Sequence, residues 1–375
     1  MRVCFRQTTT WEVGVCGASS PIVSLHGWLI RLGHVHEPLK SPKLDFPTTP
    51  KVITVTDSSP GNDLVLASSP VNNGVPTPRL TLKIVSSLLV AQPNTRLGIA
   101  KIVAVEQVRR MRGGSQAHLM RCSDQNYYVV KFRNNPQHRR VLANEMLASV
   151  LARIAGLPVP EPVVVEVTDA LLQHTPQLNI QTATGIIRCE SGLQFGSRYA
   201  VSPLEGQAFD HVPAPILRRV RNMETFAGML ALDKWTCNSD GRQAAFWRTM
   251  RQHNYAVSFI DQGNCFNGGE WNFPDAPLGG VYEQSEVYAN VVGWDSFEPW
   301  LSRIEDMGRN AISAVADEIP PGWYGANSDA LDALVRLLLE RRTLIRGLVT
   351  AFRSSSRHPF PNWGRGLQSG PAVVA

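Results

Sequence analysis

The fold is decided by two stretches of sequence, LDKWTCN at residues 232–238 and SFIDQG at residues 258–263. The first places the carboxylate of Asp233 five residues before the amide of Asn238. The second places Asp261 after an apolar run and before a glycine. Two carboxylates and an amide in this order match what phosphoryl transfer needs, one group to orient an acceptor hydroxyl and two to hold magnesium. Because the spacing alone is common, it becomes informative only with a lysine and a glutamate upstream.

A strand and a helix upstream supply these two residues. Residues 127–132, YYVVKF, are aromatic and β-branched, which predicts a strand that carries Lys131. Residues 144–155 have apolar side chains at helical spacing and stop at Gly156, which predicts a helix with Glu145 near its start. Taken singly, the two charges are typical of an edge strand and a solvated helix face. In this chain order, they favour an ion pair that directs the ammonium toward nucleotide phosphates.

A glycine turn precedes the lysine strand. Gly113 and Gly114 permit backbone conformations that other residues avoid, and their amides can approach phosphate oxygens closely. Ser115 and Gln116 add side-chain donors. We therefore predict a phosphate-covering loop. The motif itself is weak, because it lacks the spaced glycines of a protein-kinase loop and the Gly-Lys-Ser/Thr of a P-loop.

The segment from about residue 97 to residue 350 resembles a HipA-like kinase domain, the family of bacterial Ser/Thr kinases related to the HipA toxin. The most distinctive part is the glutamate helix that ends in GLPVP at residues 156–160. The other segments that carry the resemblance are Gly114-Ser115-Gln116, Val130-Lys131-Phe132, residues 233–238 and Asp261. The family usually has Asp-Arg-His where this chain has Asp233-Lys234-Trp235, which removes an arginine fork and a histidine hydrogen bond.

The resemblance implies an α+β, two-lobed, protein-kinase-like fold that binds ATP and Mg²⁺. A small β-rich N-terminal lobe would carry one key helix, and a larger C-terminal lobe would be mainly helical. The roles implied for the site are phosphate contact by Lys131, support of that lysine by Glu145, acid/base catalysis by Asp233, and metal binding by Asn238 and Asp261.

The predicted boundaries follow from composition and periodicity. Residues 1–95 are rich in proline and serine breakers and are predicted to be a disordered extension. Residues 96–202 form the N-lobe and hinge, 203–352 the C-lobe, and 353–375 a loose tail. The hinge lies near Val201 and Ser202, which we expect to contact the nucleotide. Helices are predicted over 215–222, over 223–232 with Asp233 at its end, and over 329–352 with an apolar stripe.

Composition limits the class of protein. The chain has 375 residues, a net charge of +6 and 43% hydrophobic residues, with no uninterrupted apolar stretch near the length of a membrane span. Its six cysteines lack CxxC spacing, so neither a zinc site nor a disulfide framework is predicted and a reducing cytoplasm is expected. Clusters of arginine are typical of solvated faces. We expect no membrane partner and no direct nucleic-acid partner.

The leading hypothesis for function is transfer of the ATP γ-phosphate to a serine or threonine hydroxyl of a protein acceptor. An antitoxin-like partner belongs to the same hypothesis, although the sequence carries no signal for it. A kinase for a small molecule or lipid is an alternative, since residues 264–300 contain nothing that selects an acceptor. A third reading is a nucleotide-binding pseudokinase that works as an interaction module, which the Trp235 departure favours.

Overall fold

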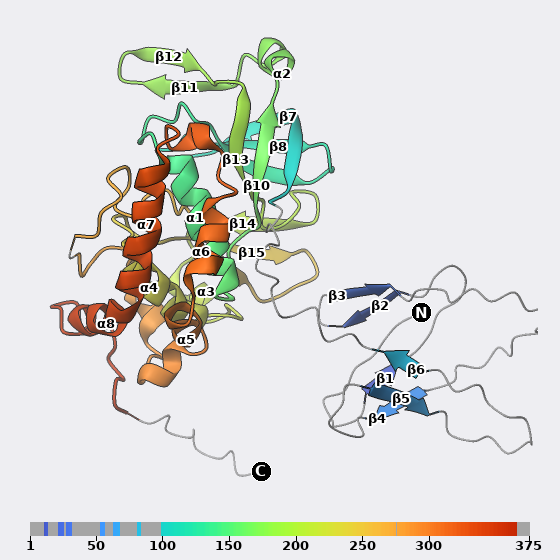
Figure 1. The fold of residues 1–375 in the computed structure, drawn as a ribbon, viewed down its shortest axis with the longest axis vertical. Helices are drawn as coiled ribbons and strands as arrows, with labels where there is room; N and C mark the ends of the chain where they lie inside the picture. Colours follow the sequence, from blue (N-terminus) through green and yellow to red (C-terminus); the bar gives the residue numbers. More distant parts are fainter. Residues whose placement is uncertain are drawn as a thin grey trace, which may run out of the picture. The chain divides into compact units, whose positions relative to one another are not determined.

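The structure is a computed structural model that describes residues 99–274 and 276–365, together with the backbone of six short strands nearer the N-terminus. The chain divides into two compact units, Met1–Thr95 and Arg96–Ala375. Figure 1 shows the helices and strands of both units.

The first unit contains a four-stranded antiparallel sheet in the order β1–β4–β5–β6 and a separate β2–β3 hairpin. Its strands are β1 (Trp11–Val13), β2 (Ile22–Leu25), β3 (Trp28–Arg31), β4 (Ile53–Thr56), β5 (Asp63–Ala67) and β6 (Thr81–Lys83). Most of the predicted disordered extension over 1–95 lies outside the described residues, and it stays a prediction.

The second unit mixes strands and helices and begins with a strand region, residues 99–198. Five strands close into a small barrel in the order β10–β13–β9–β8–β7. Neighbours pair antiparallel, except that β10 and β7 close the ring in parallel. The strands are β7 (Lys101–Arg110), β8 (His118–Cys122), β9 (Tyr127–Lys131), β10 (Pro162–Val167) and β13 (Gly192–Arg198). Buried Tyr128, Val130 and Val165 fill the interior, as the alternation along each strand requires.

Helix α1 (Val141–Ile154) links the strand region to the rest of the unit, and it contacts β10, β13, α4 and α6. It begins three residues before the predicted start because Val141, Leu142 and Ala143 are all buried. The chain leaves the helix through Gly156, whose φ of +85° lies in the left-handed region that glycine tolerates. A short helix α2 (Asp169–His174) and the hairpin of β11 (Asn179–Thr182) and β12 (Gly185–Arg188) lie at the far end of the strand region (Figure 1).

A second sheet opens the helical region, residues 206–353. Its strands are β14 (Gly206–Phe209), β15 (Gln243–Thr249) and β16 (Ala256–Ile260), antiparallel with β15 in the middle. Gln243 pairs with Ile260, so the start of β15 and the end of β16 lie side by side. Asp261 follows β16 directly and therefore lies at this end of the sheet.

Helix α4 (Thr225–Thr236) corrects one prediction about the chain. The helix does not end before Asp233 but continues to Thr236 and stops at Cys237, which has a φ of +49°. It continues because Trp235 is fully buried, and its Nε1 donates to the Leu338 carbonyl at 2.8 Å. Asp233 therefore lies inside the last turn of α4. Trp235, where this chain departs from the family pattern, is a residue of the hydrophobic core.

The remaining elements are helices and 3₁₀ turns, several of which contact α4. They are α3 (Ala214–Leu217), α5 (Trp300–Glu305), α6 (Arg309–Ala316), α7 (Ser328–Arg341), α8 (Ile345–Arg353) and the 3₁₀ turns η2 (Ser285–Tyr288), η3 (Trp294–Phe297), η4 (Pro321–Trp323) and η5 (Arg342–Leu344). Thus the helix predicted over 329–352 is two helices joined by a 3₁₀ turn.

The C-terminal segment packs further than expected. Of the loose tail predicted over 353–375, residues 353–365 are described: residue 353 ends α8, and Phe360 is buried against Phe352, Phe297 and Trp363. Residues 366–375 lie outside the described part.

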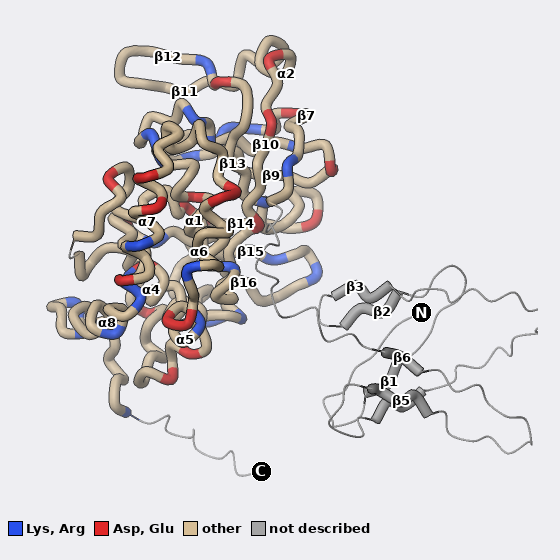
Figure 2. Tube along the Cα trace, viewed as in Figure 1, with Lys and Arg blue, Asp and Glu red and all other residues tan. Residues whose placement is uncertain are grey.

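Surface charge on the second unit is mixed. Figure 2 shows basic and acidic residues interleaved along its trace. Within the described residues, no helix is both long and apolar enough to cross a membrane.

Candidate functional site

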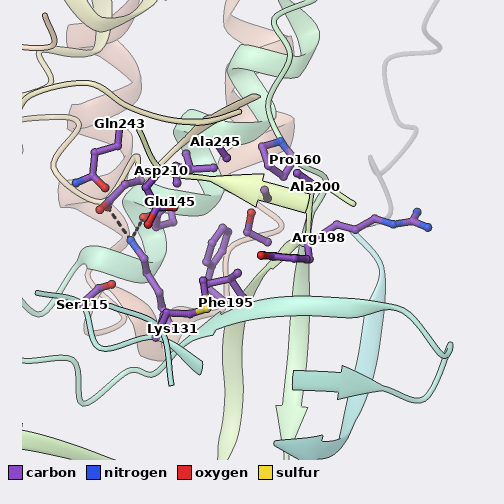
Figure 3. A pocket seen from close by; sticks show the side chains of 18 of the residues that line it. Ser115, Lys131, Glu145, Pro160, Phe195, Arg198, Ala200, Asp210, Gln243 and Ala245 are labelled. Carbon is purple, nitrogen blue, oxygen red and sulfur yellow. Dashed lines mark hydrogen bonds and ion pairs between the residues drawn. The ribbon is translucent and has the colours of Figure 1, made fainter. Parts of the chain in front are cut away.

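Lys131 is the centre of the site. It ends β9, and its Nζ donates to the carboxylate of Glu145 on α1 and to Oδ1 of Asp261, the latter at 2.7 Å (Figure 3). The lysine and Glu145 side chains are almost fully buried, whereas Asp261 retains 17% of its side-chain exposure. A buried ammonium is costly unless it is paired, so the two carboxylates make this position tenable. The predicted strand-to-helix ion pair is present.

The charge states in this cluster follow from its contacts. Burial opposes the charge on Lys131, but the carboxylates of Glu145 and Asp261 outweigh it and raise the pKa of the lysine. Burial likewise opposes ionisation of Asp261, and the nearby ammonium overcomes it and lowers the pKa of that carboxyl. At neutral pH the site therefore holds a charged lysine and a charged Asp261.

Glu145 has a second task, which is to hold the chain after β16. Its carboxylate accepts hydrogen bonds from the backbone N–H groups of Gln262 at 3.1 Å and Gly263 at 3.0 Å. Asp261 itself has a φ of +63°, a conformation that non-glycine residues rarely adopt and that must be stabilised by its surroundings. One residue of α1 thus fixes both the lysine and the backbone beside Asp261.

These charges line one wall of a pocket (Figure 3). Apolar residues, among them Val129, Phe195, Ala208 and Ile260, line the same pocket. A pocket that combines apolar lining with a few charged side chains is typical of small-molecule sites. The apolar lining suits a flat base, and the charged side chains suit phosphate groups.

The predicted glycine loop meets the pocket only in part. Met111, Arg112 and Ser115 line the pocket, whereas Gly113 and Gly114 are not among its lining residues. Gln116 faces elsewhere: its amide donates to the Gln181 carbonyl at 2.6 Å and accepts from the Gln181 N–H at 2.7 Å, like a strand partner of β11.

The predicted hinge contacts are displaced along the chain. Val201 is buried and the Ser202 hydroxyl accepts from the Leu204 N–H, and neither lines the pocket. Arg198, Tyr199 and Ala200 line it instead. The offset arises because the strand pairing reaches almost to this point, with the Tyr199 N–H donating to the Tyr127 carbonyl.

Asp233 and Asn238 form a separate cluster away from the pocket lining. Both Asp233 oxygens accept from the guanidinium of Arg242, Oδ2 from Nε at 2.8 Å and Oδ1 from Nη2. The Asn238 amide donates to Asp233 Oδ1 at 3.1 Å. All three side chains are buried. The structure thus brings Lys131, Glu145 and Asp261 together at the pocket, whereas Asp233 and Asn238 are bonded to each other and do not line it.

Two residues outside the predicted site have suitable chemistry. Asp240 is exposed, and its Oδ2 accepts from the Asn264 amide at 3.3 Å, three residues beyond Asp261. Gln243 opens β15 opposite Ile260 and lines the pocket on the same side as the Lys131 contacts (Figure 3). In the sequence, the place of Asp240 two residues after Asn238 makes it a possible further ligand, although residues 239–242 are typical of a turn, and nothing marks Gln243.

The donor set limits which metal could bind here. Within residues 99–274 and 276–365, no group of three or more His, Cys, Asp or Glu side chains could hold an ion. A metal at Asp261 would need oxygen atoms from a ligand and from water. Mg²⁺ suits such a site because it is commonly held by one or two carboxylates and substrate phosphates.

Comparison with known proteins places this site in context. Residues 102–354 match the family model described as HipA-like kinase. No curated protein matches the chain. The crystal structure of the Helicobacter pylori proinflammatory kinase CtkA is 12% identical, with a TM-score of 0.40, over 65% of this chain and 99% of that one.

Two further solved structures are similar at a comparable sequence identity. The Golgi casein kinase with Mn/ADP bound is 11% identical, with a TM-score of 0.39, over 70% of this chain and 76% of its own. HipA in the Shewanella oneidensis MR-1 complex of HipA, HipB and operator DNA is 12% identical, with a TM-score of 0.28, over 67% of this chain and 68% of its own.

Proposed function

The chain belongs to the HipA-like kinase family, and on that premise we propose that it is an ATP-dependent phosphotransferase with a two-lobed kinase architecture. The strand region would be the small lobe and the helical region the large one. The observation that carries the proposal is Lys131, held between Glu145 and Asp261 at the charged end of the pocket.

Each wall of the pocket then has a task in binding ATP. Val129, Ile260 and the backbone at Tyr199 would receive the base, and Ser115 lies where the loop can contact phosphate oxygens. Lys131 would bind the phosphates, with Glu145 holding it in position. Catalysis of this kind depends mostly on positioning and on neutralising charge, so a fixed ammonium is what the reaction needs.

The metal site needs an amide other than Asn238. Asp261 retains an exposed edge at the pocket, and Gln243 opens the neighbouring strand. We assign these two as the protein ligands. Mg²⁺, when bound with ATP, neutralises charge on the phosphate oxygens. Asn238 is buried and does not line the pocket: its Nδ2 donates to Asp233, and its Oδ1 accepts from the Asp240 N–H.

The acceptor hydroxyl needs a carboxylate that it can reach. Asp233 has no exposed side-chain surface, whereas Asp240 is exposed beside the segment that follows Asp261. We therefore assign the orienting role to Asp240. A serine or threonine of a protein remains the proposed acceptor, with a small molecule or lipid as the alternative. An antitoxin-like partner and a cytoplasmic setting remain part of the proposal.

A nucleotide-binding protein without phosphoryl transfer is the second candidate. It is favoured by the burial of Asp233 and Asn238, because the residues that the family resemblance assigns to chemistry are both bonded within the protein. On this alternative, the Lys131 cluster would bind a nucleotide and the module would act through its surface.

Incubation with γ-labelled ATP and Mg²⁺ separates these functions. The variants are Lys131→Ala, Asp240→Asn and, as a matched control, Lys101→Ala, which removes an exposed lysine. Label on a protein that disappears in the first two and persists in the control supports protein phosphorylation. Label only in small molecules supports the alternative acceptor. Nucleotide-dependent thermal stabilisation without any transfer supports the second candidate.

A further inference from the structure

We propose that Asp233 and Arg242 form a buried positioning pair that fixes the backbone at Asp261. Asp233 would thus affect metal binding through Arg242, without touching the acceptor or the nucleotide. The inference rests on the proposed function, because it assigns a task to residues that support the same metal site.

Asp233 is closed off from any substrate. Its side chain has 0% exposure and that of Arg242 has 1%. Gly280 covers it so closely that a Cβ on that glycine would lie 2.3 Å from the Cβ of Asp233. A reacting hydroxyl therefore has no room to approach this carboxylate.

Arg242 carries the connection onward to the site. Two of its nitrogens bind Asp233, and the third, Nη1, donates to the Ile260 carbonyl at 2.7 Å and lies 3.4 Å from the Asp261 carbonyl. The guanidinium thus ties the last turn of α4 to the end of β16. Its planar fork suits this task because it can bond a carboxylate and a carbonyl in one fixed geometry.

Asp261 is consequently held from two directions. Glu145 on α1 binds the N–H groups of the two residues that follow it, and Arg242 binds the carbonyl groups at and before it. Two such anchors explain how a non-glycine residue keeps a φ of +63°. Loss of either anchor should let Asp261 turn away from the metal.

The same carboxylate also reaches Asp240. The Asn238 amide donates to Asp233, and its carbonyl oxygen accepts from the Asp240 N–H at 3.1 Å. Burial opposes the charge on Arg242, and Asp233 raises the pKa of the guanidinium. The guanidinium therefore stays charged, and its contacts give a fixed reference for both proposed functional carboxylates.

The test measures the affinity for ADP with Mn²⁺ and for ADP alone in a chelator, with Mn²⁺ binding followed by electron paramagnetic resonance. The variants are Asp233→Asn and Arg242→Lys. A residue that positions a metal ligand typically changes metal affinity about tenfold or more. We expect each variant to lower the advantage of Mn²⁺–ADP over metal-free ADP about tenfold, with metal-free binding unchanged.

The matched control is Arg346→Lys, since Arg346 makes the same two-nitrogen contact with Glu305 on the exposed surface. This control should bind both probes like the wild type. If Asp233→Asn does not fold, Arg242→Lys decides the matter because it keeps the charge and loses the fork. Equal metal dependence in folded Arg242→Lys and wild type overturns the inference. If the wild type itself gains nothing from Mn²⁺, the proposed function fails as well.

Discussion

Two buried ion clusters in this protein use the same chemistry for different ends. Lys131 with Glu145 and Asp261 lies at a pocket wall and keeps one carboxylate partly exposed, whereas Arg242 with Asp233 is sealed on every side. Both clusters hold a cation that burial disfavours, and both retain it by pairing. The two clusters differ in their contact with the pocket. Asp261, which is proposed to bind a ligand, remains partly exposed, whereas Asp233, which is proposed to support the site, is fully buried.

Helix α1 also holds the chain segment that follows β16. Asn144 donates to the carbonyls of Gly263, Cys265 and Gly268, and Trp271 donates to the Asn144 oxygen. Glu145 beside it binds the start of the same segment. Helix α1 therefore anchors the open cluster (Lys131, Glu145 and Asp261), and α4 carries Asp233 of the sealed cluster (Asp233 and Arg242). Residues of both helices' clusters, Glu145 and Arg242, hold the backbone around Asp261.

The largest expected effect comes from removing a member of the open cluster. Glu145→Ala leaves Lys131 with one carboxylate and frees two buried N–H groups, so we expect the free energy of unfolding to fall by about 3–5 kcal/mol and phosphoryl transfer to be lost. Chemical denaturation measures the first effect. The control is Glu106→Ala, whose exposed pair with Arg121 should contribute at most about 1 kcal/mol. Equal losses would remove the distinction between buried and exposed pairs.

The next prediction compares an exposed carboxylate, Asp240, with a buried one, Asp233. Asp240→Asn should lower the turnover number by about 10²–10⁴, the usual contribution of a general base, while the free energy of unfolding changes by at most about 0.5 kcal/mol. Asp233→Asn should instead lower stability, since it leaves Arg242 buried without its anion. Steady-state rates and denaturation of both variants provide the check. A full rate for Asp240→Asn would return the acceptor role to another group.

A smaller effect is expected at the metal. Gln243→Ala should weaken Mn²⁺ binding about tenfold in the presence of ADP, because an amide ligand is replaced by water. Gln207→Ala is the matched control, since Gln207 lies on the same sheet, in β14, and is not among the pocket-lining residues. Paramagnetic resonance of Mn²⁺ measures both. If the two variants bind alike, Gln243 is not a ligand of the metal.

Local patterns in the sequence predicted the open cluster well. Lys131 ends a strand of alternating burial and Glu145 lies on the helix that follows, so their pairing needs only the order of adjacent elements. Asp261 directly follows the strand β16. Each of these positions can be placed from the element that carries or precedes it.

The sealed cluster and the loop could not be predicted in this way. An amide five positions after an acid is also the spacing that joins the last turn of a helix to the chain after it, and nothing local shows that Trp235 extends α4 past Asp233. Gln116 looked like a phosphate donor, but its amide binds Gln181, 65 residues away. Contacts of that range depend on packing that the sequence pattern does not contain.

The smallest expected effect concerns pH. His138 lies beside the open cluster, where its Nε2 donates to the Gly263 carbonyl at 2.9 Å and its Nδ1 accepts from the Arg140 N–H. Burial lowers the pKa of this histidine, and the charges of Lys131 and Arg140 lower it further. Both ring nitrogens are thus committed in the neutral form, and a second proton would break the bond to Arg140.

The sign follows from the two states of the chain. As pH falls below the ordinary histidine pKa of 6.5, the unfolded chain takes up the proton before the folded one does. Stability is therefore full above that pH and is lost on acidification, by at most about 1.4 kcal/mol per pH unit for one histidine. His138→Gln should reduce the loss between pH 7.5 and 5.5, and exposed His253→Gln should not. Denaturation at both pH values measures it. If both variants lose the same free energy of unfolding between the two pH values, protonation of His138 is not the cause of the acid sensitivity.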